Sequence, residues 1–457
     1  MFSRLAFILP VWNLANWRFH NWHRLYCHAA GSVRKSSTDG GIKVSSMEKS
    51  WQAVPGNAGL TDVPLRPEDE LLLCAARARI NPEIAARMKS LMQLKMDWER
   101  ILASARRHGL APLLYTHLQS ICAGEIPESI LSKLGRQFIF NAARNHSMTA
   151  ELVRILALFE EHGIPALPYK GPLLAESIYG DVALRQFEDL DILVPESKVS
   201  EAEILLRQQG YQMALELPQD RMPAYCRMKH EIPYLHPGKS ISIELHWKIS
   251  PIFFHFPIDM ERLWKRAEWI GFAGSRVRSF SKEDTLLILC ANGSRRAWEK
   301  LEFVGVVAEM LGAYPEMNWE YLFSLARELK SEQLLLLGLL ISHNLFNTEI
   351  PEPAVNRIRT NKLLHILAAG VQTRLFTPNR QSTGVMENLF LRVRLTDRWQ
   401  DGIMIILRTL FLPGYEDWRI IKLPSCLAFL YFPFRFFRVL KKYATRSFRS
   451  FFYASGL

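Results

Sequence analysis

The chain has 457 residues, of which 49% are hydrophobic and 22% are charged, and its formal net charge is +12. This composition is typical of a folded globular protein with two or three domains, and it excludes a chain that is disordered by default. The positive charge indicates an anionic partner, such as a nucleotide, a nucleic acid or a membrane surface, without choosing among them.

The six cysteines are scattered along the chain and form no Cys-x-x-Cys pair. Free thiols in a reducing compartment explain this spacing better than a disulfide framework does, so we expect a cytoplasmic protein. No apolar run reaches the roughly 18 residues that a membrane-spanning helix needs. The closest, Leu423–Phe434, is interrupted by two prolines.

Residues 1–65 are expected to be an N-terminal extension and linker, either disordered or partly a misassigned start. Residues 1–46 contain three tryptophans and one acid, Asp39. A signal or transit peptide is one interpretation of this stretch, and true initiation at Met47 is the other. Residues 48–65 are rich in proline and glycine, as linkers are.

A helical region is predicted over residues 66–144. Pro67 and the three acids after it are suited to a helix N-terminus. Asp97 is predicted to cap a helix that ends at His108, with Gly109 as the stop signal.

The pattern changes over residues 145–250, where helices and strands alternate. The predicted elements are a helix Glu151–His162, a strand Ile164–Tyr169, a helix from Gly171 to about Gly180, a strand Asp189–Val194, a helix Ser200–Gln209, and a hairpin of Ile232–Leu235 with Ile241–Trp247. This order predicts an α+β fold, in which a small mixed-sheet core is flanked by N-terminal and C-terminal helical regions.

Helical periodicity returns after the core. A helical domain is predicted over residues 251–345, with long apolar runs in Asp284–Leu311 and Trp319–Phe346. Residues 346–457 are predicted to be a helical C-terminal region with a basic, aromatic tail. That tail indicates either a peripheral membrane contact through residues 423–457 or a final helix packed on the core.

The most informative segment is the start of the predicted strand at Asp189. Asp189 and Asp191 alternate with Leu190 and Ile192, so the two carboxylates share one sheet face. Paired carboxylates suit Mg²⁺, and like charges this close resist joint ionisation without a cation. Glu244, flanked by apolar residues on a later strand, supplies a third acid for two-metal phosphoryl chemistry. The alternative is a solvated strand start with two surface acids.

Four residues are candidates for nucleotide binding: Lys170, Gly171, Arg185 and His246. Gly171-Pro172 opens a helix directly after a strand, and free backbone N–H groups at a helix N-terminus attract phosphate. Lys170 and Arg185 add positive charge. His246 supports Glu244 or the substrate in one interpretation, and is a satisfied strand histidine in the other.

Several other chemistries find little support. The chain contains no Walker A loop and no G-x-G-x-x-G, which argues against P-loop and Rossmann nucleotide binding. Cys226, His230, His236 and His246 can be assembled into a zinc site on paper, but their spacings match no common zinc pattern.

These motifs resemble the nucleotidyltransferase superfamily, whose pattern is a helix-opening glycine pair or Gly-Ser, then Asp-x-Asp, then a third acid. More closely, the chain resembles an uncharacterised bacterial nucleotidyltransferase family often found near polysaccharide or peptide biosynthesis genes. The matching residues are Lys170-Gly171, Arg185 to Val194 and Glu244 to Trp247, with Arg107 to Tyr115 upstream and Asp417-Trp418 and Leu423-Pro424 downstream. The resemblance covers roughly residues 66–443.

The resemblance implies a metal-dependent enzyme that transfers a nucleoside monophosphate from a nucleoside triphosphate, such as ATP, to an acceptor. Asp189, Asp191 and Glu244 would be the catalytic, metal-binding residues, holding two Mg²⁺ ions or Mn²⁺ in their place. The acceptor stays open, and a nucleic acid is one of the candidates beside a sugar, an antibiotic-like small molecule or a protein side chain.

Three departures from the patterns of relatives keep other functions open. Pro172 stands where relatives have a small serine or glycine, so a hydroxyl that could bind phosphate is missing. Asn292 and Val306 stand where relatives often carry a histidine and an aspartate. The alternatives are a catalytically degenerate nucleotide-binding module and a membrane-associated assembly factor in a biosynthetic pathway.

Overall fold

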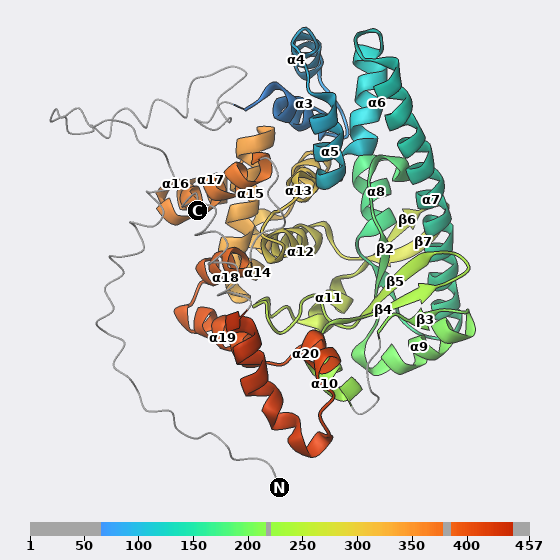
Figure 1. The fold of residues 1–457 in the computed structure, drawn as a ribbon, viewed down its shortest axis with the longest axis vertical. Helices are drawn as coiled ribbons and strands as arrows, with labels where there is room; N and C mark the ends of the chain where they lie inside the picture. Colours follow the sequence, from blue (N-terminus) through green and yellow to red (C-terminus); the bar gives the residue numbers. More distant parts are fainter. Residues whose placement is uncertain (1–64, 216–220, 378–384, 442–457) are drawn as a thin grey trace, which may run out of the picture. The chain divides into compact units, whose positions relative to one another are not determined.

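A computed structural model describes residues 65–215, 221–377 and 385–441 (Figure 1). The chain divides into two units, Met1–Ala58 and Gly59–Leu457, and every described element belongs to the second. The predicted start at Met47 and residues 442–457 of the predicted membrane contact lie outside the described residues. Within the described ranges, no helix has both the length and the apolar character needed to cross a bilayer.

Short helices occupy the first part of the described chain. They are α3 (Pro67–Ala75), α4 (Pro82–Met92), α5 (Trp98–His108), α6 (Ala111–Cys122) and the 3₁₀ turn η3 (Ala123–Glu125). The predicted ends of α5 are confirmed, since the Asp97 side chain accepts a hydrogen bond from the Arg100 N–H and Gly109 adopts a φ of 73°. A glycine tolerates that left-handed conformation where other residues are strained.

The longest helix, α7 (Glu128–Glu161), begins well before the predicted Glu151. Its first half packs Leu134 into an apolar cluster with α3 to α6. Its second half packs Leu152, Ile155 and Phe159 into the cluster beneath the sheet. One continuous helix therefore supports both the N-terminal helices and the sheet.

The central sheet has five strands in the order β1 (Leu167–Pro168), β2 (Asp189–Leu193), β5 (Ile241–His246), β4 (Glu231–His236) and β3 (Gln212–Met213). β2 and β5 are parallel and the other neighbours are antiparallel. The α+β prediction with a small mixed sheet is confirmed. The predicted strand Ile164–Tyr169 was too long, because only two of its residues pair with β2.

Further elements connect the strands: α8 (Gly171–Tyr179), the 3₁₀ turns η4 (Val182–Leu184) and η5 (Glu196–Lys198), α9 (Val199–Gln208) and α10 (Met222–Met228). One sheet face is apolar, since Leu190, Ile192, Ile243 and Leu245 are fully buried against α7 and α9. Because side chains alternate along a strand, the acids of β2 and β5 point to the opposite face.

A second sheet follows α11 (Met260–Arg266) and was not predicted. It is the hairpin of β6 (Glu268–Phe272) and β7 (Ser275–Ser279). Its turn residues, Ala273 and Gly274, have φ values of 48° and 74°. A primed turn of this kind usually shows asparagine or aspartate before glycine, so Ala273 gives the sequence no hairpin signal.

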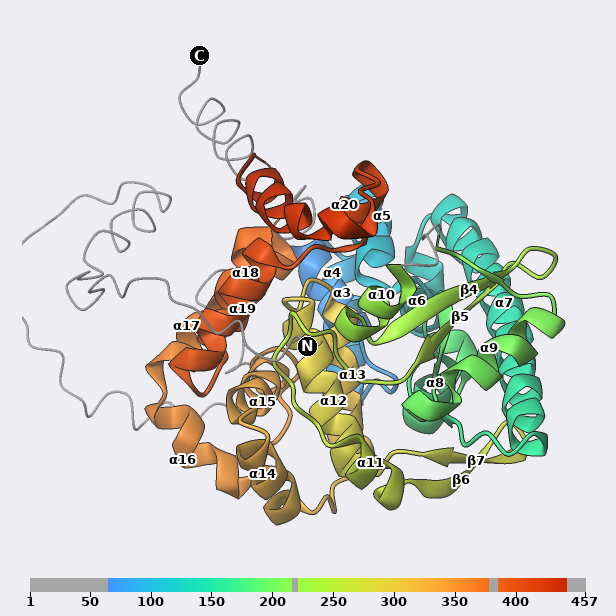
Figure 2. The same cartoon turned by 90° about the horizontal axis from the view of Figure 1, so that it is seen from below.

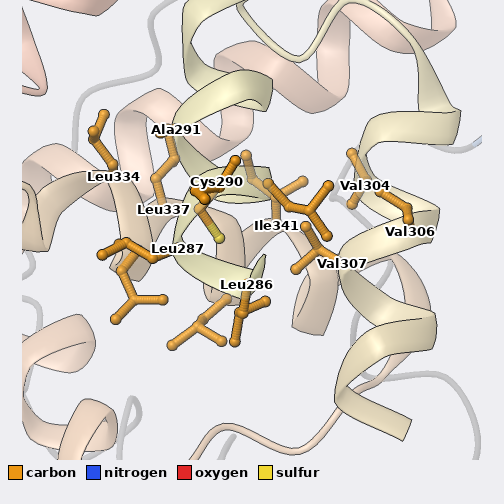
Figure 3. Close-up of a cluster of buried hydrophobic side chains, with 14 of the residues drawn as sticks. Leu286, Leu287, Cys290, Ala291, Val304, Val306, Val307, Leu334, Leu337 and Ile341 are labelled. Carbon is orange, nitrogen blue, oxygen red and sulfur yellow. The ribbon is translucent and has the colours of Figure 1, made fainter. Parts of the chain in front are cut away.

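The remaining helical region contains α12 (Lys282–Arg295), α13 (Leu301–Ala313), α14 (Trp319–Glu328), α15 (Glu332–Phe346), α16 (Glu352–Thr360) and α17 (Lys362–Phe376). Figure 3 shows its core, where Leu287 and Cys290 of α12 meet Val307 of α13 and Ile341 of α15. Each long run predicted here is two helices. Ala297 and Trp298, with φ values of 52° and 53°, break the first run.

The C-terminal segment contains α18 (Val385–Arg394), α19 (Trp399–Phe411), α20 (Tyr415–Ile420), the 3₁₀ turn η7 (Ser425–Leu430) and a helix over residues 431–441. Asp417 is fully buried and accepts a hydrogen bond from the Gly414 N–H at 2.7 Å. Its carboxylate also lies 2.5 Å from Arg438 Nε and 3.4 Å from Arg435 Nη1. These ion pairs tie the final described helix to α20.

Candidate active site

Strand pairing brings the predicted acids together. Asp191 of β2 lies opposite Glu244 of the parallel neighbour β5. Ligand atoms of Asp191, Glu244 and His246 lie within 4.8 Å of one another, close enough to hold one metal ion. Asp189, at the first residue of β2, shares the face of Asp191 but is not part of that group. Its carboxylate has no hydrogen bond or ion pair recorded with the described residues.

Asp191 is the most enclosed of these acids, with 5% of its surface exposed. Its Oδ1 lies 2.8 Å from Lys170 Nζ and 3.0 Å from His246 Nε2. The fully buried His246 ring is held at Nδ1 by the Tyr169 hydroxyl, 3.0 Å away. Asp191 is therefore oriented by two partners, of which the His246 ring is itself held by Tyr169.

The two aspartates have opposite electrostatic settings. Burial, with the negative charges of Asp191 and Glu244 adding to it, raises the pKa of Asp189 to about 7. Burial acts the same way on Asp191, but Lys170 and His246 outweigh it and hold the pKa of that carboxyl far below its ordinary value. Without a cation, one carboxyl of the pair keeps its proton near neutral pH, and a divalent cation would let both ionise.

His246 lies behind Asp191 rather than on an open surface. Burial favours its neutral form, yet hydrogen bonds to Asp191 and Glu244 outweigh burial and raise the pKa of the ring. Its distance to Glu244 Oε2 is 3.4 Å. In this position its Nε2 contacts the carboxylates and its Nδ1 contacts the Tyr169 hydroxyl.

Gly171 starts α8 directly beside β2, as predicted, and Gly180 ends the helix in a left-handed conformation. Gly171 has a φ of +51°, and a Cβ on it would lie 3.2 Å from the Asp189 carbonyl oxygen. A side chain at this position would therefore strain the backbone and press on the strand that carries the aspartates. The Leu173 N–H already donates to the Lys170 carbonyl at 3.2 Å.

Arg185 has partners within the protein. Its Nη1 donates to the Gly171 carbonyl at 3.2 Å, and its Nη2 lies 2.8 Å from Glu302 Oε1 on α13. Glu302 in turn lies against Gly109, where a Cβ would be 2.6 Å from its Oε2. The segment from Arg107 to Tyr115, through Gly109, and the segment that begins at Arg185 thus meet at one buried acid, Glu302.

Three residues of α7 position the Asp-x-Asp segment, and the sequence analysis missed them. Asn141 and Asn145 both donate to the Arg185 carbonyl, at 3.2 Å and 2.7 Å, and Arg144 donates to the Phe187 carbonyl at 2.7 Å. Asparagine is a poor residue for a helix interior, so a pair spaced by four was an available signal.

A second group of possible ligands lies behind the first. Ligand atoms of His230, Glu231 and His246 lie within 4.8 Å of one another, and Glu231 Oε2 is 3.0 Å from His230 Nε2. Burial lowers the pKa of His230 strongly. Cys226 and His236 belong to neither group of ligands found among the described residues.

Arg295, near the end of α12, is a partly buried cation whose pKa responds to acids of the sheet. Burial and the charge of Arg296 lower the pKa of Arg295, while the negative charges of Glu231 and Glu244 act in the opposite direction. Asn292 accepts a hydrogen bond from Arg295 Nη2 at 2.9 Å.

A small mixed sheet with a helix-opening glycine, an Asp-x-Asp strand and a third acid on its parallel neighbour defines a nucleotidyltransferase core. The sequence model of the family described as uncharacterised nucleotidyltransferase matches residues 95–347, more than half of the chain. The chain belongs to this family. The matched segment contains every site residue discussed above.

Two other comparisons add little. The chain is similar to the solution structure of the antibiotic-resistance factor ANT(2'')-Ia, with 14% sequence identity and a TM-score of 0.30. The similarity covers 41% of this chain and 93% of the ANT(2'')-Ia chain. None of the curated proteins matches the chain. The family membership therefore supports nucleotidyl transfer in general and leaves the acceptor undefined.

Proposed function

We propose that this protein is a metal-dependent nucleotidyltransferase that moves a nucleoside monophosphate from a nucleoside triphosphate to an acceptor. The observation that carries the proposal is the pairing of Asp191 with Glu244 across two parallel strands, with Asp189 on the same face. An oxygen of the acceptor would attack the α-phosphorus, the bond to pyrophosphate would break, and the acceptor proton would pass to a base at the site.

The carboxylate oxygens fit a hard divalent cation. Asp189, Asp191 and Glu244 would hold two Mg²⁺ ions, with Mn²⁺ as a substitute. The raised pKa of Asp189 supports this, because a bound cation would stabilise the charged carboxylate. Bound metal would supply charge stabilisation for the attacking and leaving oxygens. Glu244, whose side chain is 27% exposed, would accept the acceptor's proton.

The nucleotide would lie at the start of α8. Lys170 now pairs with Asp191, and metal binding to that carboxylate would release its ammonium group for a phosphate. The Gly171 N–H would approach the triphosphate without a side chain in the way. Arg185 and His246 would support nucleotide binding indirectly. Arg185 would hold the Gly171 carbonyl, and His246 would orient Asp191.

The test is direct labelling. The protein would be incubated with Mg²⁺, α-phosphate-labelled nucleoside triphosphates, ATP first, and cell extract, and the labelled acceptor would then be identified. We expect metal-dependent label transfer and pyrophosphate release, both absent in Asp191→Asn. Label transfer that persists unchanged in that variant would refute the site.

A nucleotide-binding module without turnover is the second candidate, and Pro172 is the observation that favours it. Proline supplies neither a backbone N–H nor a hydroxyl at the first turn of α8. If the wild type binds nucleotide with Mg²⁺ but releases no pyrophosphate with any extract, while Pro172→Ser does, the module description is correct. Turnover by the wild type rules it out.

A further inference from the structure

Exposed apolar side chains are concentrated near the C-terminal end of the described chain. Of the twenty large hydrophobic side chains that are exposed among the described residues, twelve lie between residues 399 and 440. We name these twelve the apolar band: Trp399, Ile403, Met404, Leu407, Phe411, Ile420, Leu427, Phe429, Leu430, Phe432, Phe437 and Leu440. A surface this rich in apolar groups usually marks an interaction site.

The band on α19 is one face of the helix. Trp399, Ile403, Leu407 and Phe411 recur every four residues, and Trp399 is 73% exposed. The helix is held in place by other residues, since Arg408 Nη1 donates to the Ile252 carbonyl at 3.1 Å. Within the part of the chain that the structure describes, the leucine, isoleucine and tryptophan side chains of this anchored helix form an exposed apolar face.

The two parts of the band are joined. The Phe411 and Phe436 rings stack with centroids 5.2 Å apart, and Phe437 follows at 5.7 Å. Arg435 donates to the Thr409 carbonyl at 3.3 Å, which fixes the helix over residues 431–441 against the end of α19 (Figures 1 and 2). The exposed side chains of both helices therefore belong to one connected structure.

The segment that carries the band has a net positive charge. Residues 399–441 contain six basic residues against the three acids Asp401, Glu416 and Asp417. Glu416 pairs with Arg419, and Asp417 pairs with Arg435 and Arg438. From Trp418 to the end of the chain there is no acid, and the basic residues are Arg419, Lys422, Arg435, Arg438, Lys441, Lys442, Arg446 and Arg449. Two copies that met through this segment would bring like charges together, which opposes self-association. A negatively charged surface would be attracted by the same residues.

We propose that the apolar band docks on a membrane surface that carries anionic lipid, with the basic residues after Asp417 contributing attraction. Aromatic and aliphatic side chains would enter the boundary between headgroups and acyl chains, as those of interfacial amphipathic helices do. The proposal is independent of nucleotidyl transfer, because it concerns a surface that contains none of the site residues.

The experiment is co-sedimentation of the full chain with vesicles of phosphatidylcholine mixed with phosphatidylglycerol, and with vesicles of phosphatidylcholine alone. We expect binding to the mixed vesicles that weakens with salt. The variant Trp399→Ser/Ile403→Ser/Leu407→Ser should bind more than roughly tenfold more weakly, since buried CH₂ groups dominate such binding. The matched control, Ile139→Ser/Ile204→Ser, removes exposed apolar groups elsewhere and should bind like the wild type.

Melting curves would establish that both variants keep the fold, and the assay needs no catalytic turnover. Equal vesicle binding by the wild type and the triple variant would overturn the proposal. So would the absence of wild-type binding, equal binding to phosphatidylcholine alone, or a dimer that the triple variant disrupts without any vesicle binding.

Discussion

The sheet region and the helical region are both well buried, but they use burial differently. Behind the sheet, Asp191, His246, Tyr169 and Lys170 form a chain of buried or nearly buried polar groups. Between α12, α13 and α15 the core is apolar, and Gly338 leaves no room for a Cβ beside Cys290. Burying charged groups lowers the stability of the fold, so their presence indicates a functional site. Close apolar packing, in contrast, indicates a region that stabilises the fold.

The largest effect is expected from the polar chain. Asp191→Asn should reduce turnover at least roughly a thousandfold, because the metal site would lose several kcal/mol of charge stabilisation. Pyrophosphate release and calorimetric Mg²⁺ binding would measure this. Glu201→Gln, an exposed acid on α9, is the control and should change neither. A variant with full turnover and unchanged Mg²⁺ affinity would contradict the assignment.

The contact of His108 with the helical region should weaken at acidic pH, which would lower the stability of the fold. His108 accepts a hydrogen bond from the Leu301 N–H at Nδ1 and bonds to the Leu375 carbonyl at Nε2, and burial lowers its pKa to about 4. Since the unfolded pKa is near 6.5, this contribution is present above that pH and is lost as pH falls toward 4. The full effect is on the order of 3 kcal/mol.

Melting temperatures of wild type and His108→Gln between pH 4 and 7 would test this. The variant should be less stable at pH 7, and the difference from wild type should shrink as pH falls, because glutamine does not titrate. His162→Gln, at an exposed position, is the control. A difference that stays constant over the whole range would show that His108 does not titrate in this window.

Close packing in the helical region predicts a smaller loss. A Cβ at Gly293 of α12 would lie 2.6 Å from the buried Trp298 ring, so Gly293→Ala should cost about 2 kcal/mol of stability. Gly370→Ala in α17 is the matched control, since nothing lies within 4 Å of a Cβ there. Alanine should stabilise the control slightly. Denaturant unfolding would measure both, and equal stability of the two variants would refute the packing argument.

The smallest expected effect is a gain. The raised pKa of Asp189 means that the metal-free fold disfavours its charged form, so wild-type stability falls as pH rises from about 4 to about 7. Asp189→Asn removes this penalty and should melt slightly higher than wild type at pH 8 in chelator. Near pH 4 the two should melt alike. Added Mg²⁺ should make the wild type melt higher than the variant, because it stabilises the wild type by binding. If Asp189→Asn never melts higher than the wild type, repulsion between Asp189 and Asp191 does not destabilise the metal-free fold.

Local signals predicted much of the fold. Asp97 and Gly109 marked both ends of α5, and Gly171 and Gly180 marked α8, because caps act within one turn. Alternation along β2 placed Asp189 and Asp191 on one face, since period-two geometry is local as well. The helix breaks at Ala297 and Lys330 were missed, since neither residue type announces a left-handed conformation.

The rest of the site depends on contacts between distant segments. The Arg185 ion pair with Glu302 and the hydrogen bonds from Asn145 to the chain before β2 are set by tertiary packing, so no pattern in either segment alone predicts them. The interpretation of Arg185 and His246 as direct nucleotide ligands stays untested. Their positions behind Gly171 and Asp191 favour an indirect role.

Helix α7 has a dynamic consequence for the carboxylates. Asn141 and Asn145 hold the segment before β2, while Glu151, less than two turns further on, binds Lys239 at the tip of the β4–β5 hairpin at 2.9 Å. Both strands that carry the acids are therefore attached to the same short stretch of α7. Because both strands are attached to α7 and also pair with each other, we expect the spacing between Asp191 and Glu244 to change little when the surrounding helices move.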